Sequence, residues 1–280
     1  MRNFVSCEWL KEHLVDEEIL IFDTRQDLLN QESGLKEYYQ GHIPGAYFLD
    51  GENELVGEKK EHGGRHPLPD MSVFAEIMRN FGLNEDSIVI TYGFNSARLF
   101  YMLKMIGFNR VFLLDGGIKA WTESGYDLST EIPSPLEGSF LTNFNKEIVV
   151  DREYVLENLK GEKFVLVDSR TRERFLGNVE PIDPIAGRIP GAVNWDFNSN
   201  FDASGKVISR DEIINRISEF INLGKQIVLY CGSGVTAAYN YVILDELGIK
   251  SKIYSGGWSD WISYDNFTME SGENLRFACS

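Results

Sequence analysis

The sequence is poor in the residues that build disulfide frameworks and zinc sites. Only three cysteines occur in 280 residues, and Cys7, Cys231 and Cys279 lie far apart with no CxxC pair. An odd number of scattered cysteines argues against a disulfide framework and against a cysteine-rich metal centre. We therefore expect a chain that works in a reducing compartment, the cytoplasm, without a metal ion or another cofactor.

Basic residues and long apolar runs are also scarce. Lysine and arginine number 27 against 43 acidic residues, so the formal net charge is −16. Nucleic acids and anionic membrane surfaces reward basic patches, so we expect neither as a partner. Residues 1–18 carry scattered charges and lack the apolar centre of a signal peptide. Nowhere does the chain reach the roughly 18 consecutive apolar residues of a membrane span.

What the chain does contain is an internal repeat. Its 280 residues, 43% of them hydrophobic, suit one large globular domain or two of ordinary size. Four short motifs recur in the same order, and convergent strand patterns would not produce "IPGA" twice. We infer a duplication. The pairs are "ILIFDTR" (19–25) with "FVLVDSR" (164–170), "GHIPGA" (41–46) with "GRIPGA" (187–192), "SIVITYG" (87–93) with "QIVLYCG" (226–232), and "LLDGGIKAW" (113–121) with "IYSGGWSDW" (253–261).

Each copy alternates short apolar strands with amphipathic helical segments such as 72–82 and 209–224. This alternation predicts an α/β fold of two repeated domains, each a parallel sheet with helices on both faces. Ser209 is the expected cap of its helix, with Glu212 three residues later. Because 126–140 is rich in proline, serine and glycine, we predict domains at 1–128 and 141–280, joined by a linker at 129–140.

Cys231 opens a tight loop between a predicted strand, "KQIVLY", and a predicted helix, "VTAAYNYVILDELG". Three interpretations are open: a buried structural thiol, a metal ligand or a nucleophile. Gly232 and Gly234 allow backbone N–H groups to turn toward the sulfur, and the helix that begins near Val235 adds the positive end of its dipole. Both features stabilise a thiolate, so we favour the nucleophile over the space-filling thiol.

At this point the chain resembles tandem-domain rhodanese-type sulfurtransferases, through "VDSR", "RIPGA", "CGSGVT" and "GGW..W". The resemblance implies a second domain with the reactive cysteine and a first domain without it, where Tyr92 takes the cysteine's position. The six-residue loop is similar to that of 3-mercaptopyruvate sulfurtransferases. It implies an enzyme that moves sulfur from this donor through a cysteine persulfide to a thiol, cyanide or a thioredoxin-like acceptor.

Three alternatives stay open beside this one. A thiosulfate sulfurtransferase would share the fold, but the loop lacks the two basic residues that suit thiosulfate. A non-enzymatic binding module would not need an intact Cys231 loop. A cysteine phosphatase of related fold would end its longer loop in arginine, where this chain has Ala237.

The resemblance also implies roles for individual residues. Ser233 would be joined by a histidine and an acid from the first domain, although a solvent-facing loop position is the alternative for the histidine. An arginine pair would hold the donor's carboxylate, and the loop after 174 lacks the usual second arginine. We expect Arg170 to brace the domain and Trp258 to line the pocket or lie in the core. The catalytic candidates are Cys231, Ser233, His66, Asp50 and Glu52, and the substrate-binding candidates are Arg174, Arg188, Gly232, Gly234, Val235 and Thr236.

Overall fold

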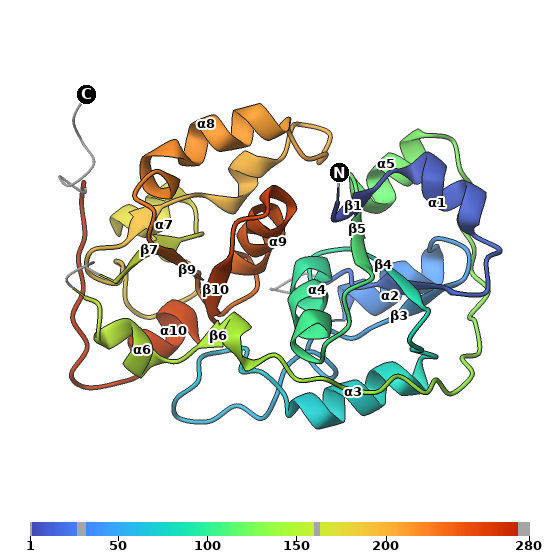
Figure 1. Ribbon diagram of the computed structural model, residues 1–280, viewed down its shortest axis with the longest axis horizontal. Helices are drawn as coiled ribbons and strands as arrows, with labels where there is room; N and C mark the ends of the chain where they lie inside the picture. Colours follow the sequence, from blue (N-terminus) through green and yellow to red (C-terminus); the bar gives the residue numbers. More distant parts are fainter. Residues whose placement is uncertain (1, 27–31, 160–162, 274–280) are drawn as a thin grey trace. The chain divides into compact units, whose positions relative to one another are not determined.

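A computed structural model describes residues 2–26, 32–159 and 163–273 and contains two parallel five-stranded sheets (Figure 1). The expected α/β fold with two repeated domains is confirmed. The first sheet has the strand order β1-β5-β4-β2-β3, and the second repeats it as β6-β10-β9-β7-β8. Strand–helix alternation produces this arrangement because parallel neighbours need crossover connections, which the helices supply.

The chain divides into two compact units. Unit 1 comprises residues 1–57, 68–146 and 201–207, and unit 2 comprises 58–67, 147–200 and 208–280. The predicted linker, 129–140, therefore belongs to unit 1, where Ser129 pairs with His42 in an isolated β-bridge. Two short segments, 58–67 and 201–207, belong to the unit built mainly from the other repeat.

The elements of unit 1 follow the predicted pattern closely. The amphipathic segment at 72–82 forms α3, and Asp70 caps it by accepting a hydrogen bond from the N–H of Ser72. The elements are β1 (Phe4–Val5), α1 (Cys7–His13), β2 (Ile19–Asp23), α2 (Ser33–Gln40), β3 (Ala46–Phe48), α3 (Met71–Asn80), β4 (Ile88–Tyr92), α4 (Ser96–Met105), β5 (Val111–Leu114) and α5 (Gly117–Glu123).

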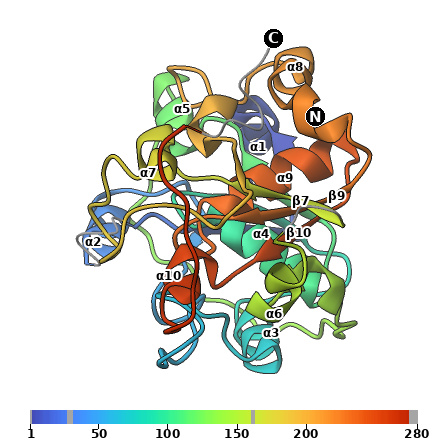
Figure 2. The same ribbon diagram turned by 90° about the vertical axis from the view of Figure 1, so that its left-hand side faces the viewer.

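In unit 2 the views of Figures 1 and 2 place α8 and α9 on one side of the sheet and α6 and α10 on the other. The predicted cap is confirmed, since Ser209 and Glu212 form a reciprocal capping box. The elements are η1 (Lys146–Ile148, whose first residue belongs to unit 1), β6 (Val149–Val150), α6 (Arg152–Leu156), β7 (Phe164–Asp168), α7 (Arg172–Leu176), β8 (Val193–Asn194), η2 (Phe197–Asn200), α8 (Arg210–Ile221), β9 (Gln226–Tyr230), α9 (Ala237–Leu247), β10 (Ser251–Tyr254) and α10 (Gly257–Trp261).

Strand register corrects one expectation about the duplication. Tyr92 lies opposite Asp23, as Tyr230 lies opposite Asp168. The two tyrosine hydroxyls also accept equivalent hydrogen bonds, from the N–H of Ile43 and of Ile189, each at 3.2 Å. Tyr92 therefore corresponds to Tyr230 and not to Cys231, and the position of the cysteine in the first repeat is occupied by Gly93. The first repeat still has no thiol at this position.

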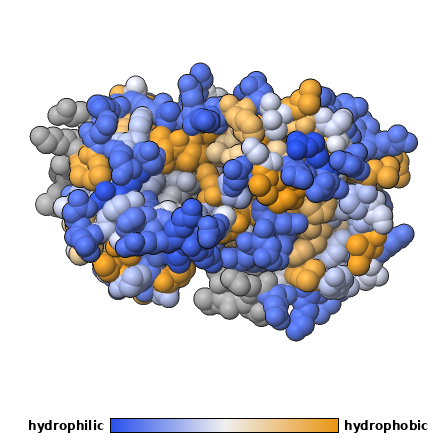
Figure 3. All heavy atoms as spheres, turned by 90° about the horizontal axis from the view of Figure 1, so that it is seen from below, coloured by the Kyte–Doolittle hydropathy of each residue, from blue (hydrophilic) through white to orange (hydrophobic). Residues whose placement is uncertain are grey.

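Apolar side chains pack between sheet and helices in each unit. One cluster in unit 2 joins strand residues such as Val228 to Trp258 and Trp261 of α10, all fully buried. On the outside, Figure 3 shows hydrophobic side chains scattered among hydrophilic ones over the face that it draws. Across the described ranges, no helix is long and apolar enough to cross a membrane.

Candidate active site

Cys231 follows β9 directly, at the carboxyl end of a strand that lies between β7 and β10. Ligand sites of open parallel sheets lie at this edge. The cysteine is buried, and the N–H of Gly234 donates a hydrogen bond to its Sγ at 3.2 Å. This contact is the inward-turned N–H that the glycine-bearing loop predicted. A backbone N–H at this position can stabilise negative charge that develops on the sulfur.

The first turn of α10 binds the backbone of the Cys231 loop. The carbonyl oxygen of Cys231 accepts from the N–H of Trp258 at 2.8 Å, and that of Gly232 accepts from Ser259 at 2.9 Å. The Trp258 indole is buried in the core and donates from Nε1 to the carbonyl of Ile185. Of its two expected places, Trp258 thus takes the core, and it supports the loop through its backbone.

The two glycines of this loop have different backbone angles and different neighbours. Gly234 has a φ of +78°, and a Cβ there would lie 2.4 Å from the carbonyl oxygen of Ser255. Gly232 is not among the described glycines with positive φ, so backbone freedom is not its purpose. Instead, a Cβ at Gly232 would lie 2.9 Å from Nη2 of Arg65 and 3.4 Å from Nη2 of Arg174. Gly232 leaves room for two guanidinium groups beside Cys231.

The next two loop positions complete the turn into the helix. Val235 is buried, and Thr236 is the N-terminal cap position of α9, whose first helical residue is Ala237. The helix therefore begins two residues later than expected. Position 237 holds no arginine, so the loop lacks the phosphate-gripping residue of a cysteine phosphatase.

Ser233 and His66 lie together although they are far apart in the sequence. His66 Nδ1 is 2.6 Å from Ser233 Oγ, and Ser233 is nearly buried. Segment 58–67 reaches this place because it binds α10: the N–H of Gly63 donates to Asp260 Oδ1 at 2.7 Å, and that of Arg65 donates to Ser259 Oγ at 3.0 Å. His66 is half-buried and contacts the serine, rather than being a solvent-facing loop residue without a partner in the site.

His62 and His66 have a spacing that zinc sites use on helices, but they do not converge. His62 stacks on Tyr264 with ring centroids 3.8 Å apart and lies 2.9 Å from Ser263 Oγ, while His66 approaches Ser233. Within the residues that the structure describes, no three His, Cys, Asp or Glu side chains are grouped closely enough to hold a metal ion.

Asp50 and Glu52 belong to unit 1. Asp50 closes a turn there, because its carboxylate accepts from the N–H of Glu52 at 2.8 Å and from the side-chain amide of Asn53 at 2.9 Å. The choice between these two acids as a partner of His66 stays a prediction.

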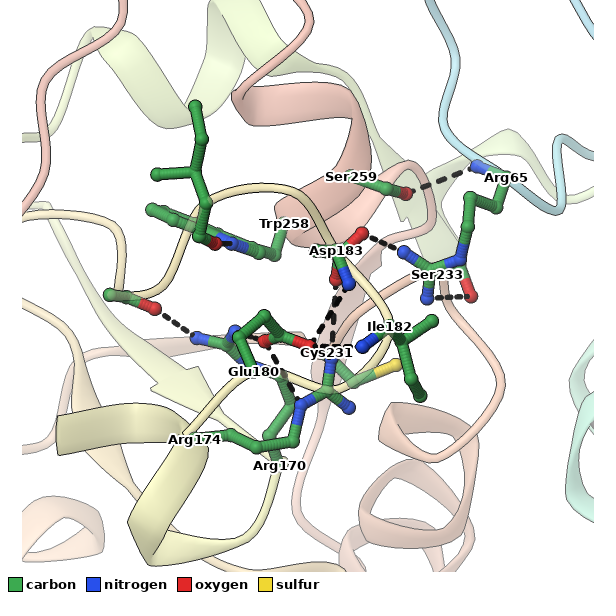
Figure 4. Close-up of polar contacts among 12 residues, drawn as sticks. Arg65, Arg170, Arg174, Glu180, Ile182, Asp183, Cys231, Ser233, Trp258 and Ser259 are labelled. Carbon is green, nitrogen blue, oxygen red and sulfur yellow. Dashed lines mark hydrogen bonds and ion pairs between the residues drawn. The ribbon is translucent and has the colours of Figure 1, made fainter. Parts of the chain in front are cut away.

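Arginine and acidic side chains form a network of ion pairs beside Cys231 (Figure 4). Arg174 donates from Nε and Nη2 to Glu180 at 3.0 and 2.7 Å, and from Nη2 to Asp183 at 3.2 Å. The other oxygen of Asp183 binds Arg65. Glu180 also pairs with Arg170 at 3.2 Å. Both acids are almost fully buried, so the loop that lacks the second arginine supplies two carboxylates instead.

The sequence analysis missed Arg65, Glu180 and Asp183. The available signals were an arginine directly before His66 and two acids in the loop after Arg174. Arg65 Nη2 is 3.4 Å from Ser233 Oγ. Burial, the largest influence, lowers the pKa of the Arg65 guanidinium, while the negative charge of Cys231 acts in the opposite direction.

Arg188 and Arg170 both face the backbone. Arg188 is buried and donates from Nη1 to the carbonyls of Phe175 at 3.3 Å and Gly272 at 2.7 Å. None of its described contacts is with the Cys231 loop, so the structure does not bring it to the other site candidates. Arg170 forks onto Asp168 and donates to the carbonyl of Gly187 at 2.7 Å. Its expected bracing role is confirmed.

Comparisons with known proteins find similar sequences and a similar fold. The rhodanese-like domain family matches residues 6–124 and 151–264. The chain is 34% identical to the 3-mercaptopyruvate sulfurtransferase of Escherichia coli over 92% of its length and 94% of that protein. It is 31% identical to thiosulfate/3-mercaptopyruvate sulfurtransferase 2 of Arabidopsis thaliana, over 94% of this chain and 84% of the relative. The crystal structure of SseA from Escherichia coli superposes with a TM-score of 0.81 at 34% identity, covering 92% of this chain and 100% of SseA.

Proposed function

This chain belongs to the rhodanese family and is a sulfurtransferase enzyme, and we propose that its sulfur donor is 3-mercaptopyruvate. The sulfane sulfur passes through a persulfide on Cys231 to a small thiol, cyanide or a thioredoxin-like protein. The non-enzymatic module is thereby set aside. The observation that carries the proposal is the Cys231 loop itself, in which the N–H of Gly234 donates to Sγ and Ser233 contacts His66.

The reaction is a double displacement. The Cys231 thiolate attacks the donor's sulfur and forms an S–S bond, while the donor's C–S bond breaks. The electron pair of that bond leaves on carbon as the enolate of pyruvate, which then takes up a proton. In the second half, an acceptor thiolate or cyanide attacks the outer sulfur and releases the Cys231 thiolate. No electrons are gained or lost overall, so no redox cofactor is needed, and ping-pong kinetics follow.

Ser233 is the group that meets the charge developing on the donor. As the enolate leaves, negative charge grows on the keto oxygen, and a preorganised hydroxyl donor stabilises it. His66, 2.6 Å away, orients that hydroxyl. We assign the carboxylate end of the donor to the guanidinium of Arg174, whose Nη1 can donate a charge-assisted hydrogen bond to it.

The identity of the donor is supported by the neutral loop. Thiosulfate is a dianion and gains from cationic residues, whereas Gly232 and Ser233 supply no charge. Thiosulfate is the second candidate, because one relative carries both donors in its name. We expect kcat/KM to be higher with 3-mercaptopyruvate than with thiosulfate, and steady-state kinetics with the two donors checks this. A preference for thiosulfate would contradict the argument from the loop.

The persulfide has a direct test. Incubation with donor alone is expected to add the mass of one sulfur atom to the peptide that contains Cys231, and to neither the Cys7 nor the Cys279 peptide. Cys7 is a poor nucleophile because burial, aided by Glu8, raises its pKa to about 11. Cys231→Ser is expected to keep the fold and lose the transfer. Sulfur found on another cysteine would rule out the mechanism.

A further inference from the structure

Two arginines from distant parts of the sequence converge beside Cys231. Arg174 comes from α7, and Arg65 comes from segment 58–67, which belongs to the same unit. Their Nη2 atoms lie 3.4 and 2.9 Å from the place that a Cβ at Gly232 would occupy. The side chains of Arg174 and Arg65 are 15% and 30% exposed, so each is partly open to solvent. Gly232 follows the nucleophile directly, and the two cations therefore flank it.

Asp183 bridges the arginine pair, by which we mean Arg65 and Arg174. One of its oxygens binds Arg65 Nη1 and the other binds Arg174 Nη2 at 3.2 Å. The carboxylate is 1% exposed, so the contact is strong and little screened. Two guanidinium groups repel each other, and the single anion between them holds them at a set separation. Figure 4 shows the two side chains reaching Asp183 from different directions.

The pair keeps hydrogen-bond donors for a ligand. Arg174 uses Nε and Nη2 for Glu180 and Asp183, and within the described chain its Nη1 donates to nothing. Arg65 uses Nη1 for Asp183, and its Nη2 lies 3.4 Å from Ser233 Oγ, a distance that leaves this group available to a closer acceptor. Arg174 Nη1 is not among the described buried polar atoms that lack a partner, so solvent or a ligand reaches this atom.

We propose that Arg65 binds the donor's carboxylate together with Arg174, and that Asp183 is the positioning residue that holds the pair. An α-keto acid has its carboxylate and its keto oxygen on adjacent carbon atoms. Arg65 Nη2 and Ser233 Oγ lie 3.4 Å apart, close enough to contact neighbouring groups of one donor molecule. Arg65 therefore receives the carboxylate while Ser233 faces the keto oxygen. This inference rests on the proposed function, and it assigns the second arginine that the loop after Arg174 lacks.

The charge of the cluster selects a monoanion. Three arginines in it face three carboxylates, so the cluster is neutral before the Cys231 thiolate adds one negative charge. A donor with a single carboxylate is repelled less than a dianion such as thiosulfate. The members of the cluster are Arg65, Arg170, Arg174, Asp168, Glu180 and Asp183.

The test compares two donors that differ only in the carboxylate. Mercaptoacetone has the thiol and the keto group of 3-mercaptopyruvate but no carboxylate. In Arg65→Gln we expect kcat/KM for 3-mercaptopyruvate to fall about tenfold to hundredfold, the range of one charge-assisted hydrogen bond, mainly through KM. We expect kcat/KM for mercaptoacetone to stay within about twofold of the wild type, since no carboxylate contact is lost. Equal losses with both donors, or no loss with either, would overturn the proposal.

Two further variants sharpen the test. Arg172→Gln removes an exposed arginine of the same helix, α7, which pairs with Glu273, and is expected to change neither donor's kinetics. Asp183→Asn is expected to raise KM for 3-mercaptopyruvate, because the arginine pair loses its brace. A lower KM would show that Asp183 competes with the donor and would overturn the positioning role.

The outcome also separates this inference from the proposed function. If the wild-type enzyme forms no persulfide with 3-mercaptopyruvate, the proposed function fails. If the wild type forms it and Arg65→Gln keeps the full preference for the carboxylate-bearing donor, only the role of Arg65 fails. Persulfide formation from mercaptoacetone, followed by mass, shows that the variant is folded and its nucleophile intact.

Discussion

At the scale of single residues, Glu54 shows how burial changes the chemistry of a side chain outside the active site. Burial raises the pKa of this carboxyl to about 7, the hydrogen bond donated by the N–H of Asp50 opposes the shift, and the charge of Asp50 adds to it. The folded protein therefore holds a proton on Glu54 at pH values where the unfolded chain has released it.

The sign of the pH effect follows from that shift. A raised folded pKa stabilises the folded state fully below the unfolded value of about 4.5, and this contribution is lost as pH rises through about 7. Glu54→Gln is expected to remove this loss. The free energy of unfolding of the variant, measured relative to that of the wild type, is therefore expected to be higher at pH 8 than at pH 5. Urea unfolding at both pH values measures it. Glu123→Gln, at an exposed carboxylate of unit 1, is the control. An unchanged pH dependence in Glu54→Gln would contradict the prediction.

At the scale of elements, the turn between β9 and α9 combines local and distant constraints. The strand ends at Tyr230 and the helix begins at Ala237, as hydrophobic spacing predicts within two residues. The shape of the turn depends on α10, whose first N–H groups bind the carbonyls of Cys231 and Gly232. Helix and strand periodicity report local packing, so they place the turn without describing its partner.

Gly234 in this turn and Gly248 at the end of α9 have the same backbone angle. Comparing alanine variants of the two separates the cost of the backbone conformation from the cost of a steric clash. Gly234 and Gly248 both have a φ of +78°, but a Cβ at Gly248 would meet nothing within 4 Å. Gly248→Ala is expected to cost about 1–2 kcal/mol, the penalty of the left-handed conformation. Gly234→Ala is expected to cost more and to abolish persulfide formation, because its Cβ would lie 2.4 Å from the carbonyl oxygen of Ser255. Urea unfolding and mass analysis check both. Equal losses in the free energy of unfolding for the two variants would show that the chain around Ser255 moves to accommodate the Cβ, and would contradict the prediction.

At the scale of the whole molecule, the duplication explains Arg188 better than substrate binding does. Its counterpart in unit 1 is His42, whose two ring nitrogens lie 2.8 and 3.0 Å from the carbonyls of Tyr38 and Glu131. Each side chain packs on an aromatic ring of its own unit: His42 on Tyr38 with centroids 3.9 Å apart, and Arg188 over Phe175 at 4.4 Å. The histidine and the arginine both tie a loop to backbone carbonyls.

The Arg188→His variant is therefore expected to keep kcat/KM for 3-mercaptopyruvate. Arg188→Ala is expected to remove the hydrogen bonds to the carbonyls of the buried Phe175 and the exposed Gly272, and to lower the free energy of unfolding by about 1–3 kcal/mol. Donor kinetics and urea unfolding of both variants measure this. If Arg188→His instead raised KM for 3-mercaptopyruvate about tenfold without changing stability, Arg188 would be one of the residues that bind the donor's carboxylate.

The sequence by itself determined the two-unit parallel fold, the turn that carries Cys231 and, through a family motif, the approach of His66 to Ser233. Strand and helix periodicity, caps and a repeated motif are local signals, and each is written within a few consecutive residues. The sequence did not determine the unit boundaries, because each of the segments 58–67 and 201–207 belongs to the compact unit built mainly from the other repeat.

Only the tertiary structure decided which charged side chains meet. Arg65 and Asp183 are 118 positions apart, and their pairing depends on where segment 58–67 binds α10. The correspondence of Cys231 with Gly93 was also decided there, by strand register, because a one-residue shift along similar apolar strands leaves their pattern almost unchanged. Long-range ion pairs and register depend on three-dimensional packing, and neither leaves a periodic trace in the order of residues.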